Sequence, residues 1–326
     1  MRQLDLTERL LRLRGVPVFR SMSATQLAPL AASMRSNTFE KGQVILREDE
    51  SPRAFHMLLT GSVTMRRHGN TIRTITAPGG VGFLSLLART AGGTEAVAES
   101  RVETFELGVD AIDEMFEDHF PVLLGTMRWV ADRLLQENVL APPRPYQPPP
   151  EDYEELLHDG EIGIVERIFL IRRTLAFRKA NVNSVARLAR QMKEIRVPAG
   201  EYLWRTGDAS IGSFFIVKGK GELRWGDQQV QHVGATYIVG GIEAIAGKPR
   251  WNDFVVTEPV TALVGNRERL IDMFEDDLDV ALQFLSMMAS FLLVLWDRRA
   301  ERDAGIPSTP AQAFRPSGLP PGLAPP

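Results

Sequence analysis

The four residues MFED occur twice in the chain, at Met115–Asp118 and at Met273–Asp276, so the second copy begins 158 positions after the first. The same offset matches further residues without a gap, and the glycines stay in step. Matched pairs include Glu8 with Glu166, Arg9 with Arg167, Phe19 with Phe177, Met34 with Met192, Gly42 with Gly200, Gly61 with Gly219 and Gly82 with Gly240. This period is far too long for a solenoid, so the sequence predicts two copies of one domain.

Two proline-rich stretches mark the predicted boundaries. The segment APPRPYQPPP at 141–150 holds six prolines in ten residues, which disfavours helix and sheet and predicts an extended spacer. A second stretch ends the chain and is predicted to be a disordered tail. The expected organisation is a first domain at 1–140, a linker at 141–152, a second domain at 153–300 and a tail at 301–326.

Composition narrows the classes of function. The 326 residues are 44% apolar, carry a formal charge of −3, and include no cysteine. This excludes disulfides, thiolate catalysis and zinc sites built on sulfur. A nearly neutral chain also gives no electrostatic reason to expect nucleic acid or an anionic membrane as partner. Because the N-terminal stretch lacks the unbroken apolar core of a signal peptide, we expect a cytoplasmic protein.

Each copy follows the order helix, short strands, helix. Amphipathic spacing predicts helices at 6–14 and 164–172, followed by short helices near 25–34 and 183–192. Strand-like runs punctuated by glycine follow in both copies, among them QVILRE, FHMLLTGSVTM and FFIVKGKGELRW. This pattern predicts an antiparallel barrel or roll flanked by helices.

The longest apolar run, Val280–Trp296, contains three polar residues and is shorter than the roughly 20 apolar residues that a membrane span needs. We therefore expect a buried or dimer-forming helix. Its stripe is either a homodimer seam or a cover for the barrel, and the sequence leaves both open. The stripe consists of Leu285, Met288, Leu292 and Trp296.

The order and spacing of several segments resemble the cyclic-nucleotide-binding domains found in catabolite activator protein and in the regulatory subunit of cyclic-AMP-dependent protein kinase. The segments are VPVFRSMSATQLAPLA at 16–31, KGQVILRED at 41–49, AGEYLWRTGD at 199–208, the hairpins LLTGSV and IVKGKG, VGFLSLL at 81–87 and VGGIEAIAGKPR at 239–250. The resemblance implies a mainly β fold with flanking helices, in the form of two tandem β-roll (double-stranded β-helix) domains.

The family's phosphate-binding cassette resembles F-G-E-L-A-L-L followed by P-R-x-A. A short helix that begins at glycine directs N–H groups at the cyclic phosphate, an arginine contacts the phosphate oxygens, and a glutamate accepts from the ribose hydroxyl. The residues expected to bind ligand in the second copy are Gly240, Gly241, Ile242, Glu243, Arg250, Trp251 and Asn252. The corresponding residues of the first copy are Gly82, Phe83, Leu84 and Gly92.

Both cassettes depart from the family pattern. Arg250 matches the phosphate arginine, but Gly241 stands at the glutamate position, and Glu243 could substitute only if the turn were rearranged. In the first copy Phe83 replaces the glutamate and Gly92 the arginine. Loss of a charge-assisted contact worth about 1.5–3 kcal/mol weakens binding roughly 10- to 150-fold. The first site is therefore expected to be degenerate, because both charged residues are replaced. The second site is expected to keep the arginine without the glutamate.

Each of these residues also has a purely structural interpretation. Arg250 could be a solvated turn arginine beside Lys248, Glu243 a surface or capping carboxylate, and Gly240 and Gly241 residues that any strand-to-helix turn needs. The five histidines show no metal-ligand spacing, and no nucleophile–base pattern occurs, so we expect neither an enzyme nor a metal site.

Two hypotheses of function remain. The first is a regulatory sensor that binds a cyclic nucleotide or related anion in the second copy, moves the segment Glu268–Met288, and signals to a separate, unidentified protein. The second is a scaffold whose rolls have lost nucleotide binding. Transcriptional control would need a DNA-binding module, and the short proline-rich segment after Ala300 does not provide one.

Overall fold

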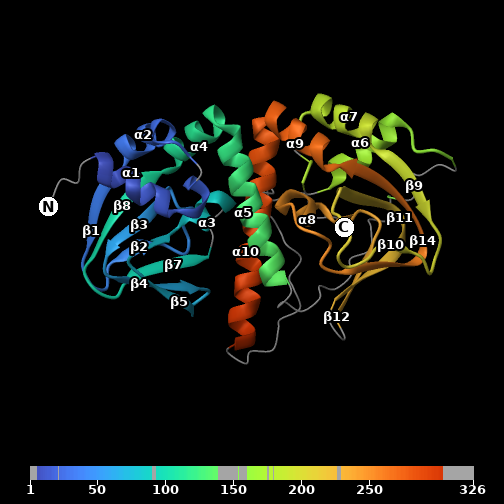
Figure 1. Cartoon of the computed structure of the whole chain (residues 1–326). Coiled ribbons are helices and arrows are strands. Elements are labelled where there is room, and N and C mark those ends of the chain that lie inside the picture. The colour runs from blue at the N-terminus through green and yellow to red at the C-terminus, as the bar shows by residue number, and fades with distance from the viewer. Residues whose placement is uncertain are drawn as a thin grey trace, which may run out of the picture.

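Two β-rolls lie side by side, and two long helices stand between them (Figure 1). The computed structural model describes residues 6–20, 22–89, 93–138, 153, 160–174, 176–178, 180–225 and 229–303. The predicted linker at 141–152 and all but the first residues of the predicted tail lie outside the described residues. Those domain boundaries therefore stay predictions.

The first roll consists of two antiparallel four-stranded sheets, in the orders β1-β8-β3-β6 and β2-β7-β4-β5. Its first helices begin where the sequence predicted them, and a capping box between Ser23 and Gln26 fixes the start of α2. The elements are α1 (Leu6–Gly15), η1 (Pro17–Phe19), α2 (Ala24–Ser33), β1 (Arg35–Phe39), β2 (Val44–Leu46), β3 (Ala54–Thr60), β4 (Ser62–Arg67), β5 (Asn70–Thr76), β6 (Gly79–Val81), α3 (Phe83–Ala88), β7 (Thr94–Ala98) and β8 (Val102–Gly108).

The second roll repeats this plan, except that β11 and β14 run unbroken through both faces and join them into one six-stranded sheet. Gly61 and Gly219 occupy the same position of the repeat at φ +82° and +87°, where an added Cβ would collide with the neighbouring backbone. The elements are α6 (Ile164–Arg173), α7 (Val182–Gln191), β9 (Lys193–Val197), β10 (Tyr202–Trp204), β11 (Gly212–Trp225), β12 (Gln229–Gly234), β13 (Ile238–Val239), α8 (Gly241–Ala246) and β14 (Asp253–Asn266). The duplicated roll predicted from the sequence is confirmed.

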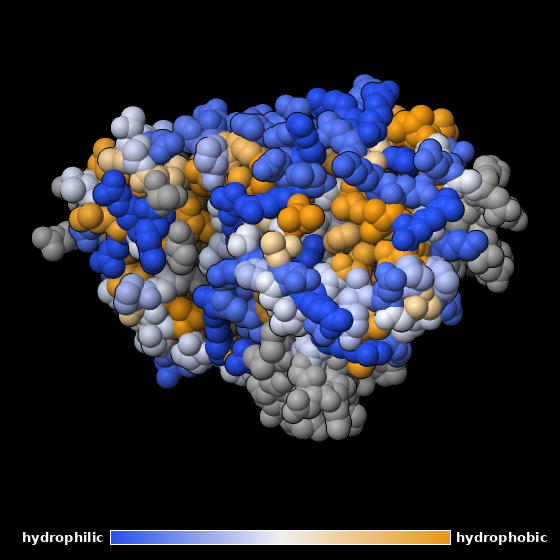
Figure 2. Space-filling view, turned by 45° about the vertical axis from the view of Figure 1, so that its right-hand side comes forward, coloured by the Kyte–Doolittle hydropathy of each residue, from blue (hydrophilic) through white to orange (hydrophobic). Residues whose placement is uncertain are grey.

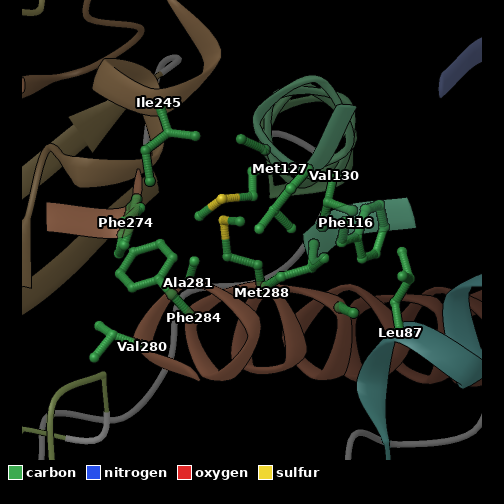
Figure 3. Close-up of a cluster of buried hydrophobic side chains, with 14 of the residues drawn as sticks. Leu87, Phe116, Met127, Val130, Ile245, Phe274, Val280, Ala281, Phe284 and Met288 are labelled. Atoms are coloured by element: carbon green, nitrogen blue, oxygen red, sulfur yellow. The ribbon is translucent and has the colours of Figure 1, made fainter. Parts of the chain in front are cut away.

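A short and a long helix follow each roll: α4 (Val109–Asp118) and α5 (Phe120–Asn138) in the first copy, α9 (Arg267–Asp276) and α10 (Leu278–Asp303) in the second. Helices α5 and α10 pack together and run in the same direction (Figure 1). Met127 and Met288 meet between them (Figure 3), and neither side chain is exposed. The two copies thus pair inside one chain, as the subunits of a symmetric dimer would.

Each long helix also covers the short helix of the other copy. Helix α5 packs on α8 of the second roll, and α10 packs on α3 of the first. The hydroxyl of Ser286 on α10 donates to the carbonyl of Ala88 at the end of α3 at 2.7 Å. Lys248, which follows α8, pairs with Asp132 on α5 at 3.6 Å. Helices α3 and α8, which follow Gly82 and Gly240 and are called the cassette helices below, are therefore each in contact with the opposite half of the chain.

The packing of each long helix on the opposite copy shows where the apolar stripe of the last helix lies. Leu285, Met288 and Leu292 are buried against the rest of the chain. Met288 meets Met127 of α5, and α10 also packs on α3, so the stripe is buried inside the chain, partly in a helix–helix seam and partly as a cover for the roll of the other copy. Trp296, the last residue of the stripe, is only partly buried. The segment Glu268–Met288, expected to move as one unit, is divided between α9 and α10 at Asp277.

By length and apolarity alone, Leu278–Arg299 resembles a membrane span, with a mean hydropathy of 2.0. In this fold the helix instead lies between the two rolls, and 56% of that window is buried inside the protein. Packing against α5 and α3 accounts for its apolar character, because a helix enclosed by other elements is hydrophobic over much of its circumference.

Replacing Met288 with alanine should lower the free energy of unfolding by about 2–5 kcal/mol, because it leaves a cavity at the centre of the α5–α10 contact. The matched control is Met287→Ala, which truncates a neighbouring methionine that is only partly buried; its cost should be about 1 kcal/mol or less. Urea unfolding measures both. Equal losses for the two variants would contradict this packing.

Candidate functional site

A glycine turn links β13 to α8 in the second roll. Gly240 adopts a left-handed conformation at φ 75° and ψ 2°, and α8 begins at the next residue. A Cβ on Gly240 would collide with the guanidinium of Arg250, whereas the nearest neighbour of a Cβ on Gly241 would be 3.5 Å away. The turn therefore needs glycine at position 240 both for its φ and for the arginine beside it.

Arg250 lies inside the roll, only 2% exposed. Its Nη1 donates to the carbonyl of Gly240 at 2.7 Å and its Nη2 to the carbonyl of Gly212 at 2.8 Å. The guanidinium carbon lies 4.4 Å from the ring centroid of Trp204 and 5.6 Å from that of Phe214. Arg250 is thus a buried, hydrogen-bonded cation, and the solvated-turn interpretation is wrong.

Glu243 is also buried, at 4% exposure. Burial raises the pKa of its carboxyl, and the attraction of Arg250 and a hydrogen bond from Trp251 oppose this rise. Burial likewise lowers the pKa of Arg250, while Glu243 and Asp208 act in the opposite direction. Each of the two groups thus influences the pKa of the other, and because Glu243 is buried, its surface-carboxylate interpretation is wrong.

Aromatic rings fill the space next to this pair. The ring of Trp204 lies 5.3 Å from that of Phe214 and 5.0 Å from that of Phe254, and its Nε1 donates to Oδ1 of Asn252 at 3.1 Å. A pocket elsewhere in the second roll holds about 20 Å³, enough for a water molecule. It lies among α6, α7 and β11, is lined by residues such as Phe177, Leu188 and Met192, and does not include Arg250.

The residues expected to bind ligand in the second copy therefore come together. Glu243, Arg250 and Asn252 are buried in one corner of the roll, Gly240 touches the guanidinium, and Trp251 stacks on Trp225 at 5.2 Å. Gly241 and Ile242 form the first turn of α8 and are partly exposed. Whether this corner binds a ligand stays a prediction.

In the first roll, the position expected to have lost its glutamate is occupied by a ring. Gly82 has φ +91° and is left-handed like its counterpart Gly240. The ring of Phe83 packs against Phe19, Phe55 and Trp129 at centroid distances of 5.2–6.2 Å. Leu84 is buried beside it, and Gly92 lies outside the described residues. Phe83 is thus part of the hydrophobic core.

The first roll contains a buried cation that was not predicted from the sequence. Arg67, the last residue of β4, is 6% exposed and donates from Nη1 to Oγ1 of Thr94 at 2.7 Å. A signal for it existed, because Val63, Met65 and Arg67 alternate along one strand and so point the same way. The expectation that the first copy had lost its pocket arginine considered only position 92.

Comparison with known proteins gives a family match in each half of the chain. The family described as the cyclic nucleotide-binding domain matches residues 36–119 and 194–277, again at an offset of 158. These two ranges cover just over half of the chain. No curated protein matches it in sequence.

A comparison with solved structures finds matches that share little sequence with this protein. The cAMP-bound regulatory domain of Toxoplasma gondii PKA is 16% identical, with 89% of this chain and 99% of that chain covered and a TM-score of 0.34. The regulatory subunit of a cAMP-independent protein kinase A from Trypanosoma brucei is 14% identical, covering 86% and 87%, with a TM-score of 0.33. The sensor domain of the transcriptional regulator DNR from Pseudomonas aeruginosa is 20% identical, covering 40% and 91%, with a TM-score of 0.37. At these values the three structures carry no argument about ligand or partner.

Substituting alanine for Gly240 should destabilise the protein by at least about 1–2 kcal/mol, because an L-residue is strained at this φ and its Cβ would displace Arg250. Gly241→Ala is the matched control, since it adds the same methyl group where there is room, and we expect no loss. Thermal or urea unfolding of the two variants tests this, and a Gly240→Ala variant as stable as the wild type would refute it.

The raised pKa of Glu243 predicts a pH-dependent difference from Glu243→Gln. Folding disfavours the ionised carboxyl, so the stability that Glu243 contributes is complete below its ordinary pKa of 4.5 and is lost as the pH rises through the raised value. Glutamine does not ionise. Between pH 4.5 and 7 the wild type should therefore lose more unfolding free energy than the variant. Parallel urea titrations over this range measure the difference, and a constant gap would contradict the prediction.

Proposed function

Because the chain belongs to the family of cyclic nucleotide-binding domains, we propose that it is a non-enzymatic, cytoplasmic regulatory protein whose second roll takes a cyclic nucleotide or a related anionic ligand at Arg250. One observation carries this proposal: Arg250 lies inside the roll with both terminal nitrogens directed to backbone carbonyls. Carbonyls are neutral acceptors, and a phosphate oxygen accepts more strongly from a guanidinium.

Ligand binding would then be an exchange of partners. The phosphate replaces the carbonyls of Gly240 and Gly212 on the guanidinium, and those carbonyls must find other donors or water. Glu243, close enough to Arg250 to shift its pKa, is the group that would accept from a ribose hydroxyl. The rings of Trp204 and Phe214 would have to shift, because they fill the neighbouring space.

The signal would pass between the two copies. Helix α8 packs against α5, which belongs to the first copy, and Lys248 ties the segment after α8 to Asp132 on α5. A displaced α8 would therefore act on the α5–α10 pair, and would change its population of arrangements rather than move the segment Glu268–Met288 alone. The partner protein that responds is unidentified.

A scaffold without nucleotide binding is the second candidate, and the packing of Phe83 favours it for the first roll. Surface residues add support, because hydrophobic patches interrupt a largely hydrophilic face on the side of the second roll (Figure 2). Leu6 and Leu11 on α1 are exposed, as are Ile164 and Phe169 at the matching positions of α6. Exposed apolar patches that are surrounded by polar residues are typical of surfaces that bind proteins.

Calorimetric titration with cyclic AMP and cyclic GMP separates the two candidates. We expect saturable heat with the wild type and a roughly 10- to 150-fold weaker affinity in Arg250→Lys, which keeps the charge but loses the planar fork. Arg224→Ala is the control, because this arginine is exposed on β11 and pairs with Glu222. Its affinity should equal that of the wild type.

Flat traces at millimolar ligand, with circular dichroism showing folded protein, would overturn the sensor and leave the scaffold. Saturable binding that is unchanged in Arg250→Lys would show that a ligand binds elsewhere. Either result leaves the family assignment intact, since that assignment does not depend on a working pocket.

A further inference from the structure

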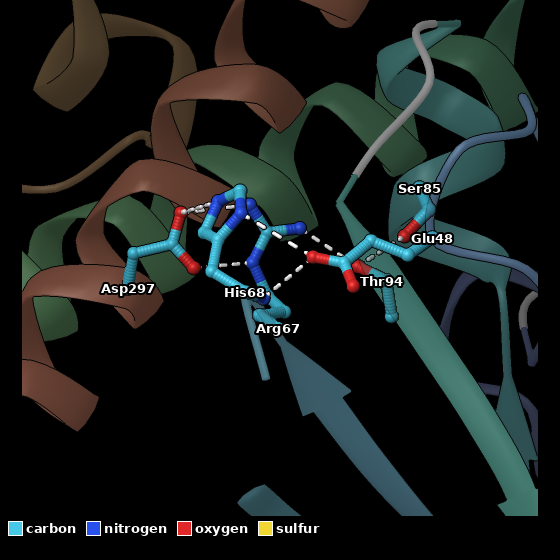
Figure 4. A network of polar contacts seen from close by, with 6 residues as sticks. All are labelled: Glu48, Arg67, His68, Ser85, Thr94 and Asp297. Atoms are coloured by element: carbon cyan, nitrogen blue, oxygen red, sulfur yellow. Dashed lines mark hydrogen bonds and ion pairs between the residues drawn. The ribbon is translucent and has the colours of Figure 1, made fainter. Parts of the chain in front are cut away.

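Three buried polar side chains meet in the first roll, at the end of β4. The guanidinium of Arg67 donates to the hydroxyl of Thr94 at 2.7 Å, and the hydroxyl of Ser85 on α3 donates to the same oxygen at 3.3 Å (Figure 4). Thr94 and Ser85 are each 2% exposed. The three residues match Trp225, Asn252 and Glu243 of the second roll at the 158-residue offset, so they occupy the corresponding corner.

An acidic side chain from the other copy closes this corner. Asp297, on α10, accepts from Nε of Arg67 through Oδ1 and from Nη2 through Oδ2, the latter at 2.7 Å. Its Oδ2 also lies 3.6 Å from Nε2 of His68, whose Nδ1 faces Glu48 at 3.4 Å. The carboxylate is 16% exposed, whereas Arg67 is 6% exposed, so the anion sits on the solvent side of the buried cation.

We propose that Arg67, Thr94 and Ser85 form an oxyanion site in the first roll, that Asp297 occupies it as an internal ligand, and that a phosphate group competes with Asp297 for it. The planar fork of arginine binds a carboxylate and a phosphate in the same two-pronged way. The hydroxyl groups of Thr94 and Ser85 can turn to donate to a third oxygen, which a carboxylate does not have and a phosphate does.

The end of α10 is attached in a way that permits this exchange. Among the residues of α10 up to Arg299, for which burial is described, Leu295 is the last buried apolar residue. Beyond it, the contacts with the rest of the chain are polar or partly exposed: Arg73 lies over the ring of Trp296 at 5.0 Å, and Arg299 pairs with Glu137 at 3.3 Å. Such contacts cost little to open near a helix end. A bound phosphate would thus release residues 296–303 from the β4–β5 hairpin while the α5–α10 core stays packed.

This site shares no residue with the one proposed around Arg250, and it does not depend on nucleotide binding there. Phe83 still fills the space beside α3. The ligand class is therefore a phosphate or phosphate ester that reaches Arg67 from the solvent side.

The test uses inorganic phosphate as the probe and the full chain carrying Arg250→Lys, in which phosphate binding at the second roll is weakened. Asp297→Asn keeps the shape of the side chain and removes its charge, and should raise phosphate affinity at least about tenfold in calorimetry. Adding Arg67→Gln should abolish that gain. Glu258→Gln, which removes an exposed carboxylate on β14 that pairs with Lys220 and does not belong to the proposed site or the end of α10, should leave the affinity unchanged.

Hydrogen exchange on the chain with Asp297 intact supplies a second measurement that does not need the Asp297 variant to fold. Saturating phosphate should speed exchange of amides 296–303, and Arg67→Gln should remove this response to phosphate. The proposal is overturned if folded Asp297→Asn binds phosphate no better than its parent, if the gain survives Arg67→Gln, or if phosphate leaves exchange at the end of α10 unchanged. Each of these results would make Arg67–Asp297 a structural ion pair alone.

Discussion

The apolar contact between α5 and α10 is the interaction on which the rest of the structure depends. It brings Met127 and Met288 together in the buried core, and it holds Ile245 of α8 on one side and Leu87 of α3 on the other (Figure 3). Because each long helix covers the short helix of the opposite copy, neither cassette helix can shift without changing this contact. Two rolls joined only by a linker could respond to ligands independently, whereas two rolls packed through this pair cannot.

The two rolls solve one electrostatic problem in different ways. Each buries an arginine at the same corner, and a buried cation is costly unless it is hydrogen-bonded or paired. In the second roll the compensation is local, since Arg250 donates to two carbonyls of its own roll and lies near Glu243. In the first roll it comes from a distance, through the carboxylate of Asp297 on the other copy. The charge of Arg250 is therefore compensated within the second roll. The charge of Arg67 is compensated across the interface between the two copies.

The candidate site was predictable as far as the resemblance to the family's cassette reached, and that resemblance covers one short stretch of each copy. Gly240, Glu243 and Arg250 lie within eleven positions of one another, and the strand-to-helix turn between β13 and α8 brings them together. Phe83 was recognised as an apolar replacement because it stands at the glutamate position of the cassette that this segment resembles. Arg67 was missed because the family pattern draws attention to position 92, although its alternation with Val63 and Met65 already pointed it inward. Asp297 lies 230 positions from Arg67, and no local pattern connects the two.

By itself, the sequence determined the duplicated roll, the positions of the flanking helices and the apolar character of the last helix, because periodicity and glycine placement act through neighbouring residues along the chain. It did not determine what that last helix covers. An apolar stripe such as Leu285, Met288 and Leu292 can be buried equally well against its own roll, a second molecule or the other copy. Only the tertiary structure decided among these, because hydrophobic burial has no direction and depends on the shape of the surface that the folded chain presents.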